Sequence, residues 1–355
     1  MIRRFLFVLL LAPFCLQAQE TFPPVEELVQ DLKSGNQQEK RDAARLLSMM
    51  GEKASPATKA LVASLDTGKS QIWFHSVTAL ANIGNAVEDE AIPALVDAFR
   101  DRSRYQEQVR FRSAHALSRI GKRVIPALRK AMDSSSSTTR QGVCMTLGGM
   151  GDAAESGYDL LEKALSDESS VVRGAAIDAL GGLGKPVVPL LRKSLKSDEA
   201  LIQDTAVLAI AKLGKDGASL KVDLFRVLKN EKDEDDQSEI IRAIAAVGGS
   251  SSEMIQQIEY ALMSGNVDLM NAAYDVVLRL KRDSAPLVVL GNKWLQSGDV
   301  MKQEQAAEIA SVMGSHAASL VGGLVKIASK IEDHSEKPWA TVGEGGEWNY
   351  VVCGL

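Results

Sequence analysis

A thirteen-residue phrase constrains this chain more than any other feature, because it recurs along most of the sequence. Its clearest copy, Val172–Gly184, has the pattern of an amphipathic helix that ends at a glycine. The closing glycine returns about every 33 residues, a period typical of repeat architectures. It occupies Gly51, Gly84, Gly121, Gly151, Gly184, Gly214, Gly248 and Gly314, with Lys281 at the one remaining position. The spacing predicts about nine units.

The pattern inside each copy predicts a pair of helices. Apolar residues eight, seven, four and one positions before the glycine form one stripe on an α-helix, and no stretch of the repeats alternates like a strand. A helix that turns back sharply often ends in a left-handed glycine. Prolines then lie near the start of the second helix, where a missing N–H does no harm: Pro56, Pro93, Pro126, Pro189 and Pro286. We therefore predict an all-α, right-handed α-solenoid (an α–α superhelix) over residues 24–332.

The two ends of the chain depart from the repeat. Residues 1–18 have the layout of a signal peptide, with Arg3 and Arg4 before a short apolar run and Ala18 at the cleavage position. The run is too short to span a membrane, so the mature chain is expected to be exported, periplasmic or secreted, without a spanning helix. Residues 24–33 are predicted to be an N-terminal cap helix with one polar face. The aromatic and glycine-containing tail, 333–355, lies outside the repeat.

Composition excludes some classes of function. The net charge is −5 over 355 residues, which argues against bulk binding of nucleic acid, since that requires clustered Lys and Arg. Cys144 and Cys353, the cysteines left after cleavage, do not make a disulfide framework. Cys144 falls at a core position of its helix. His75 and His115 lack any metal-ligand spacing, and nothing pairs a nucleophile with a base. We predict no catalytic residue, no cofactor and no metal.

Two copies of the phrase carry a resemblance to a known family. Val172–Gly184, with Arg173, and Val109–Gly121, with Arg110, resemble the HEAT-like repeat of the phycobilisome-lyase type. The resemblance covers most of the mature chain and implies an α-solenoid (armadillo-type fold) that serves as a scaffold or binding surface. Some members of the family attach or detach bilin pigments inside cells, and the export signal argues against that role here.

The arginine eleven positions before the glycine is part of this resemblance. It is present as Arg110, Arg140 and Arg173. The resemblance implies a structural ladder, in which each arginine bonds to acids or helix ends of the neighbouring unit. The alternative is a grip on a phosphate or carboxylate ligand.

Two features are candidates for binding a partner. Trp73, beside Phe74, replaces the ladder cation in the second unit, and tryptophan is enriched at binding hot spots. The alternative is that Trp73 packs over the inserted loop 85–89. The second helices carry a basic row that includes Arg129, Lys130, Arg192 and Lys193, which would attract an acidic partner. The alternative there is ordinary solvated surface.

These observations predict an exported, non-catalytic scaffold for protein–protein interaction whose partner is an unknown protein. Two other classes stay open. One is a lyase-like enzyme or chaperone that holds a tetrapyrrole, such as a bilin. The other is a nucleic-acid-binding protein built from HEAT-type repeats, which the charge and the export signal disfavour.

Overall fold

The computed structural model describes residues 22–67, 70–100, 106–248, 251–280, 285–328, 341–342 and 348–349. The predicted signal peptide, Lys281, Cys353 and most of the tail lie outside the described residues. The chain forms two compact units, one ending at Ala91 and the other beginning at Ile92, directly after the inserted loop 85–89. The first unit contains α1 (Val25–Ser34), α2 (Gln37–Met49), η1 (Gly51–Ala57), α3 (Thr58–Ala63), η2 (Ser64–Thr67), α4 (Ser70–Ile83) and η3 (Gly84–Ala86).

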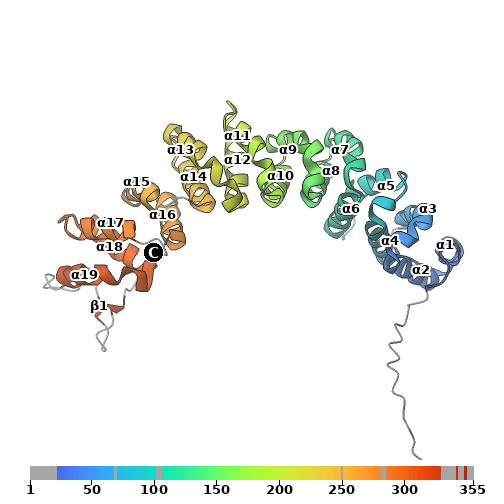
Figure 1. The fold of residues 1–355 in the computed structure, drawn as a ribbon, viewed down its shortest axis with the longest axis horizontal. Helices are drawn as coiled ribbons and strands as arrows, with labels where there is room; N and C mark the ends of the chain where they lie inside the picture. The colour runs from blue at the N-terminus through green and yellow to red at the C-terminus, as the bar shows by residue number, and fades with distance from the viewer. Residues whose placement is uncertain are drawn as a thin grey trace, which may run out of the picture. The chain divides into compact units, whose positions relative to one another are not determined.

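The second unit holds most of the helix pairs (Figure 1). The helix α5 (Ala91–Asp97) starts at the boundary. It is followed by η4 (Ala98–Arg100), α6 (Gln106–Ile120), η5 (Gly121–Val124), α7 (Ile125–Met132), α8 (Ser137–Gly149), η6 (Gly151–Gly157), α9 (Tyr158–Leu165), α10 (Ser170–Leu183), η7 (Lys185–Val187), α11 (Val188–Ser194), α12 (Ala200–Leu213), η8 (Gly214–Leu220), α13 (Lys221–Asn230), α14 (Glu234–Val247), α15 (Ser251–Met263), α16 (Val267–Leu280), α17 (Ala285–Leu295), α18 (Val300–Met313), η10 (Gly314–Leu320) and α19 (Val321–Ala328).

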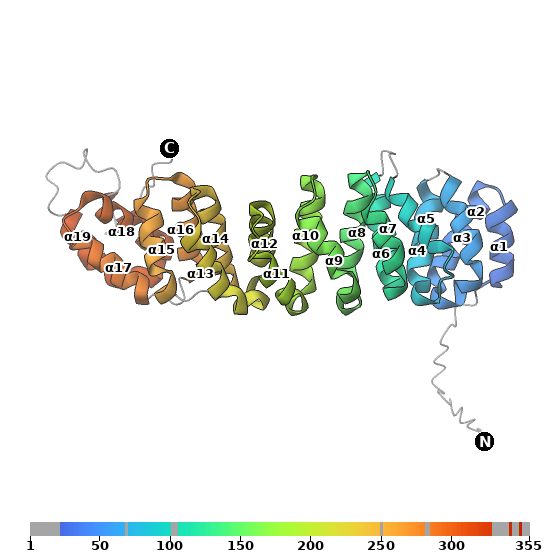
Figure 2. The same ribbon diagram turned by 90° about the horizontal axis from the view of Figure 1, so that it is seen from above.

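The helices of the second unit are arranged in two layers. The even-numbered first helices form one layer and the odd-numbered second helices form the other, and consecutive first helices lie side by side (Figures 1 and 2). In α10 the buried stripe includes Val172, Ala176 and Leu180, which are 0% exposed, and Leu183 at 8%. The predicted all-α repeat solenoid is confirmed as a fold class.

One buried position was missed by the sequence pattern. From α4 onward, the residue five before the closing position is buried in the first helices, as at Ala179, and it is usually small. A β-carbon added at Gly148 on α8 would lie 2.9 Å from the Ala179 Cα on α10. Small side chains at these two positions therefore let neighbouring first helices approach closely, and burial against a neighbour extends the stripe beyond the four predicted positions.

The turn glycines were predicted correctly in position, and the structure refines their conformation. All eight have positive φ. Gly248 adopts the left-handed helical conformation, with φ 100° and ψ 46°. Gly184 (φ 73°, ψ −153°) and Gly214 (φ 59°, ψ −133°) lie in a different region that is open almost only to glycine. There a 3₁₀-helix starts at or directly after the glycine, so the chain continues into another helical turn without a left-handed helical cap.

A second recurring turn precedes the first helices. Seventeen residues before the closing glycine, a side-chain oxygen accepts a hydrogen bond from the backbone N–H two residues further on. The Asp167 Oδ1–Ser169 N distance is 2.9 Å, and the Ser264 Oγ–Asn266 N distance is 3.0 Å. Ser134, Ser197, Glu231 and Ser297 make the same bond. Such local bonds compete with helix formation and so fix the start of each repeat.

One described stretch, Val300–Ile327, is long and apolar enough by composition to cross a membrane. Gly314, with φ 59°, divides it into α18, η10 and α19. Ala306, Ile309 and Leu320 within it are fully buried, and α18 packs on α16 and α17. These three residues belong to the core of the last helix pair, whereas Val321 and Val325 on α19 are exposed.

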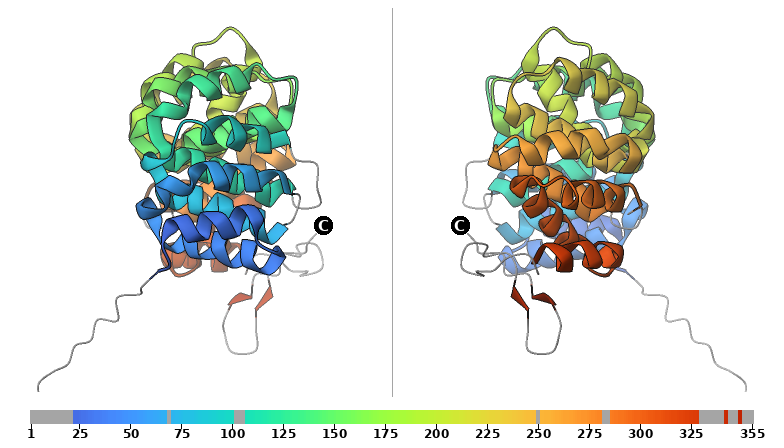
Figure 3. Two further views of the ribbon diagram at one scale, coloured as in Figure 1. Left: turned by 90° about the vertical axis from the view of Figure 1, so that its right-hand side faces the viewer. Right: turned by 90° about the vertical axis from the view of Figure 1, so that its left-hand side faces the viewer.

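Two short strands follow the last helix. β1 (Thr341–Val342) pairs antiparallel with β2 (Trp348–Asn349), with Val342 opposite Trp348, and the two lie side by side in Figure 3. The first helix, α1, lies where the cap was predicted and contacts α2, η1 and α3 through a face that buries Leu28 and Leu32.

Candidate functional site

The arginine of the fourth repeat joins its first helix, α8, to the turn that precedes the next first helix, α10. Arg140, on α8, donates from Nε to Asp167 Oδ2 at 2.6 Å and from Nη2 to Asp167 Oδ1 at 2.8 Å. It also donates to the Ser134 carbonyl oxygen and to Glu168. The Arg140 and Asp167 side chains are only 9% and 8% exposed. Burial opposes ionisation of Asp167, but the hydrogen bonds from Arg140 and from the Ser169 N–H outweigh it and lower its pKa.

The other two ladder arginines make different contacts. Arg173 donates to the backbone carbonyls of Asp167 and Glu168, at the start of its own helix. Arg110 is 7% exposed and donates from Nη1 to Gln141 Oε1 at 2.9 Å. Its Nε is buried without a hydrogen-bond partner in the described part of the chain. The three arginines therefore all hold helix starts or neighbouring helices, and Arg110 does so with one polar group unsatisfied.

Sequence reasoning did not find that glutamines continue this ladder. Gln203, Gln237 and Gln303 occupy the same position in later repeats and donate from Nε2 to the carbonyls of Leu195, Glu231 and Leu295. The constant eleven-residue offset from the glycine was the available signal. A neutral amide reaches a helix start as an arginine does, but it brings no charge for a neighbouring acid.

The predicted basic row is engaged in contacts between repeats. Arg129 on α7 pairs with Asp159 on α9, with Nη2–Oδ1 at 3.1 Å. Arg192 on α11 pairs with Asp223 on α13 at 3.1 Å. Lys193 pairs with Glu162 at 2.6 Å, and Lys130 is exposed. Because three of these four cations already face an acid, the row offers an acidic partner little unpaired charge.

The aromatic candidates lie on α4 in the first unit. Trp73 and Phe74 are both half-buried. The Phe74 ring meets the His75 ring edge to face, with centroids 5.3 Å apart. Neither side chain is fully exposed, as a binding anchor would be, and neither is fully buried in the core.

Exposed apolar side chains occur in both helix layers, and the first helices expose Phe111 (63%) and Val267 (68%). In the second-helix layer they begin at α13: Val222 is 69% exposed, Tyr260 on α15 52%, and Val289 on α17 68%. Val321 and Val325 on α19 continue the row. None of the large apolar side chains in the fully described helices α7, α9 and α11 is exposed. Contiguous exposed apolar surface on a soluble protein marks an interaction site.

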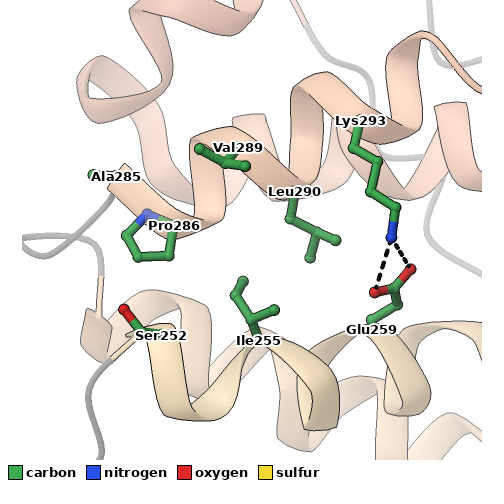
Figure 4. A pocket seen from close by; sticks show the side chains of 8 residues that line it. All are labelled: Ser252, Ile255, Glu259, Ala285, Pro286, Val289, Leu290 and Lys293. Atoms are coloured by element: carbon green, nitrogen blue, oxygen red, sulfur yellow. Dashed lines mark hydrogen bonds and ion pairs between the residues drawn. The ribbon is translucent and has the colours of Figure 1, made fainter.

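A groove interrupts this row between α15 and α17 (Figure 4). Its volume is about 490 Å³, within the range of ligand pockets. The two helices run in the same direction, so that Ser252 faces Ala285 and Pro286 at one end and Glu259 faces Lys293 at the other. Ile255, Val289 and Leu290 form the walls between these ends.

The charges at the end of the groove satisfy each other. Lys293 Nζ lies 3.1 Å from Glu259 Oε1 and 3.4 Å from Oε2. The buried Trp294 donates from Nε1 to Glu259 Oε1 at 3.3 Å. Burial opposes ionisation of Glu259, but the bonds from Lys293 and Trp294 outweigh it and lower its pKa. The groove is therefore apolar along its walls and neutral at this end.

The sequence did carry a signal for the groove. Val222 and Val289 stand where α7, α9 and α11 carry Pro126, Asp159 and Pro189. An apolar residue on the outward side of a second helix is a departure from the repeat, but the sequence pattern alone did not show that it was outward.

The described residues contain no candidate metal centre and one buried thiol. No group of three or more His, Cys, Asp or Glu side chains there is placed to hold a metal ion. Cys144 is fully buried, and burial raises the pKa of its thiol to about 12, so the reactive thiolate form is suppressed.

Comparison with known proteins identifies the repeat. Residues 103–173 and 158–245 match the family of HEAT repeats. No curated protein matches the chain. Among solved structures, the phycocyanin lyase complex of CpcE and CpcF from Nostoc sp. PCC7120 aligns with 22% identity and a TM-score of 0.34, over 73% of this chain and 96% of that chain. An engineered protein aligns with 21% identity and a TM-score of 0.25, over 73% of this chain and 97% of that one.

The later repeats keep part of this pattern: α18 is followed by Gly314 and carries Gln303 at the ladder position, whereas α16 carries Met270 there. Residues 103–245 of this chain are therefore HEAT repeats.

Proposed function

We propose that this chain is an exported, non-catalytic scaffold that binds a protein partner through the second helices from α13 to α19. HEAT repeats indicate protein–protein interaction, and the row of exposed apolar side chains at Val222, Tyr260 and Val289 supports this placement. Contacts between repeats use most of the predicted basic row, which favours the apolar row as the binding surface.

Site-specific photocrosslinking tests the placement. A photoreactive amino acid replaces Tyr260 or Val289 on the proposed surface, and Lys130 or Lys193 on α7 and α11 as matched exposed controls. We expect the same partner to be crosslinked at 260 and 289 and not at 130 or 193. Equal crosslinking at all four positions, or crosslinking confined to 130 and 193, would exclude the placement, and no crosslink at any position would exclude the scaffold.

Export rests on the layout of residues 1–18, where two arginines precede the apolar run. Sequencing the N-terminus of the chain recovered from the exported fraction should show that it starts directly after Ala18. A chain that begins at Met1 and stays in the cytoplasm would contradict export.

A lyase-like or chaperone role can be tested separately. It predicts a saturable shift in visible absorbance when a tetrapyrrole is added to the mature chain. The scaffold proposed here predicts no shift.

A further inference from the structure

The groove between α15 and α17 is long enough to hold two turns of a partner helix. Ser252 and Glu259 mark its ends on α15, and seven residues of helix rise by about 10 Å. The residues i, i+4 and i+7 of a partner helix lie on one face over the same length. Three such side chains would therefore fit along Ile255, Val289 and Leu290.

The charges in the groove decide the chemistry of its occupant. The charged side chains that line the groove, Lys293 and Glu259, neutralise each other at 3.1 Å. A charged segment would compete with this pair, and leaving a partly buried charge unpaired is unfavourable. An uncharged apolar face leaves the pair intact and gains free energy by covering the walls.

The direction of the occupant follows from the helix dipoles. Both α15 and α17 begin at the Ser252 end of the groove, so their positive dipole ends lie together there. A partner helix that runs antiparallel to them places its negative C-terminal end against these two N-termini.

From this geometry we infer that the groove binds an amphipathic helix of a protein partner, antiparallel to α15 and α17, through apolar residues at i, i+4 and i+7. The inference rests on the proposed scaffold function and names the partner segment that this surface takes. Val289, which is 68% exposed, is the central contact on the open side of the groove.

A designed peptide tests the inference with the full-length mature chain. The peptide is helical, carries leucine at i, i+4 and i+7 and a fluorophore at its N-terminus, and is titrated by fluorescence anisotropy. We expect saturable binding, at least tenfold weaker binding of a peptide with the same composition in scrambled order, and little change with salt, because the groove's charges are already paired.

Two variants form a matched pair. Val289→Glu should weaken peptide binding at least tenfold, since it places a charge in the apolar wall. Val267→Glu, at an equally exposed valine on the first helix α16, should leave binding within twofold of the unaltered chain. Both positions are on the surface, so far-ultraviolet circular dichroism should show the same helical content in each.

The inference is overturned if the scrambled peptide binds equally well, if Val289→Glu binds as the unaltered chain does, or if no peptide binds. If no peptide binds but a partner still crosslinks at Val289, the scaffold proposal stands and the helical occupant is wrong. If neither peptide nor partner is captured there, both fail.

Discussion

The middle repeats, α6 to α11, and the C-terminal repeats, α12 to α19, share one helix-pair plan but place their charges differently. In the middle, Arg140 and Asp167 form a buried ion pair, and Arg129 and Lys193 link second helices to acids of neighbouring repeats. In the C-terminal repeats glutamine takes the ladder position on α12, α14 and α18, and the second helices expose Val222 and Val289. Both regions have ion pairs between repeats, such as Lys293–Glu259 in the C-terminal one. The middle differs in having a buried pair, and the C-terminal region differs in leaving apolar surface on its second helices.

The largest expected effect comes from converting the middle ladder into the C-terminal kind. Arg140→Gln leaves the Asp167 carboxylate, whose side chain is 8% exposed, without its cation. Breaking one partner of a buried pair should lower the free energy of unfolding by about 3 kcal/mol. Urea unfolding followed by circular dichroism measures the loss, and hydrogen exchange of the α8 and α10 amides locates it.

The control is Gln203→Met on α12, where the amide bonds only to a backbone carbonyl, at 3.0 Å. It should cost about 1 kcal/mol. Equal losses at 140 and 203 would show that the buried charge in the middle repeats has no special role.

The close approach of the middle first helices is tested next. Gly148→Ala would place a methyl group 2.9 Å from the Ala179 Cα, so the two backbones must move apart. Overpacking of this kind should destabilise the chain by about 2 kcal/mol. Gly174→Ala on α10, where a β-carbon meets nothing within 4 Å, should instead stabilise it by about 0.5 kcal/mol or more. Thermal melts of both variants test this prediction. If both substitutions shift the melting temperature in the same direction, the close packing at Gly148 does not explain the difference.

A smaller effect, an increase in stability, is expected when Arg110 receives an acidic partner. Ser134 makes the turn that Asp167 makes one repeat later, and Asp167 is the residue that receives Arg140. Ser134→Asp should therefore place a carboxylate beside the buried Arg110 and stabilise the chain by about 1 kcal/mol. The gain should vanish when Arg110→Met is added, and a gain that persists would assign it to the turn alone.

The smallest effect concerns pH at the junction of α12 and α14. Burial, and then the charges of Asp236, Glu231 and Asp233, raise the pKa of Asp204 to about 6. The folded state then binds this proton more tightly than the unfolded state, whose Asp pKa is about 3.9. The resulting destabilisation is present above pH 6 and is relieved as the pH falls through that value.

Asp204→Asn removes this like-charge repulsion. It should stabilise the chain above pH 7 by roughly 1 kcal/mol at most, since the carboxylate is partly exposed and screened by solvent. The difference from the unaltered chain should shrink towards pH 5. Melting temperatures across this range test the prediction, and a constant difference would contradict it.

Much of the fold was predictable from the sequence, because its determinants are local. Positive φ at glycines such as Gly184, and apolar residues such as Leu180 at helical spacing, are properties of a single repeat. The buried small residue at Ala179 was missed because its role depends on a neighbouring repeat, where Gly148 faces it.

The site was less predictable for the same reason. A cation such as Arg129 looks available in the sequence, but its acid, Asp159, comes from the next repeat. Whether Val289 points outward also depends on packing between helices. Patterns within one repeat show the helix pair, and contacts between repeats decide which side chains are left for a partner.

The contacts between repeats have a consequence for how the chain folds. Arg140 and Asp167 are 27 residues apart in sequence, Arg192 and Asp223 are 31 apart, and Trp294 and Glu259 are 35 apart. Contact order is therefore low, and the entropy of loop closure is modest at every step. Any adjacent pair of repeats can nucleate and then extend in either direction, as in a one-dimensional chain of coupled units.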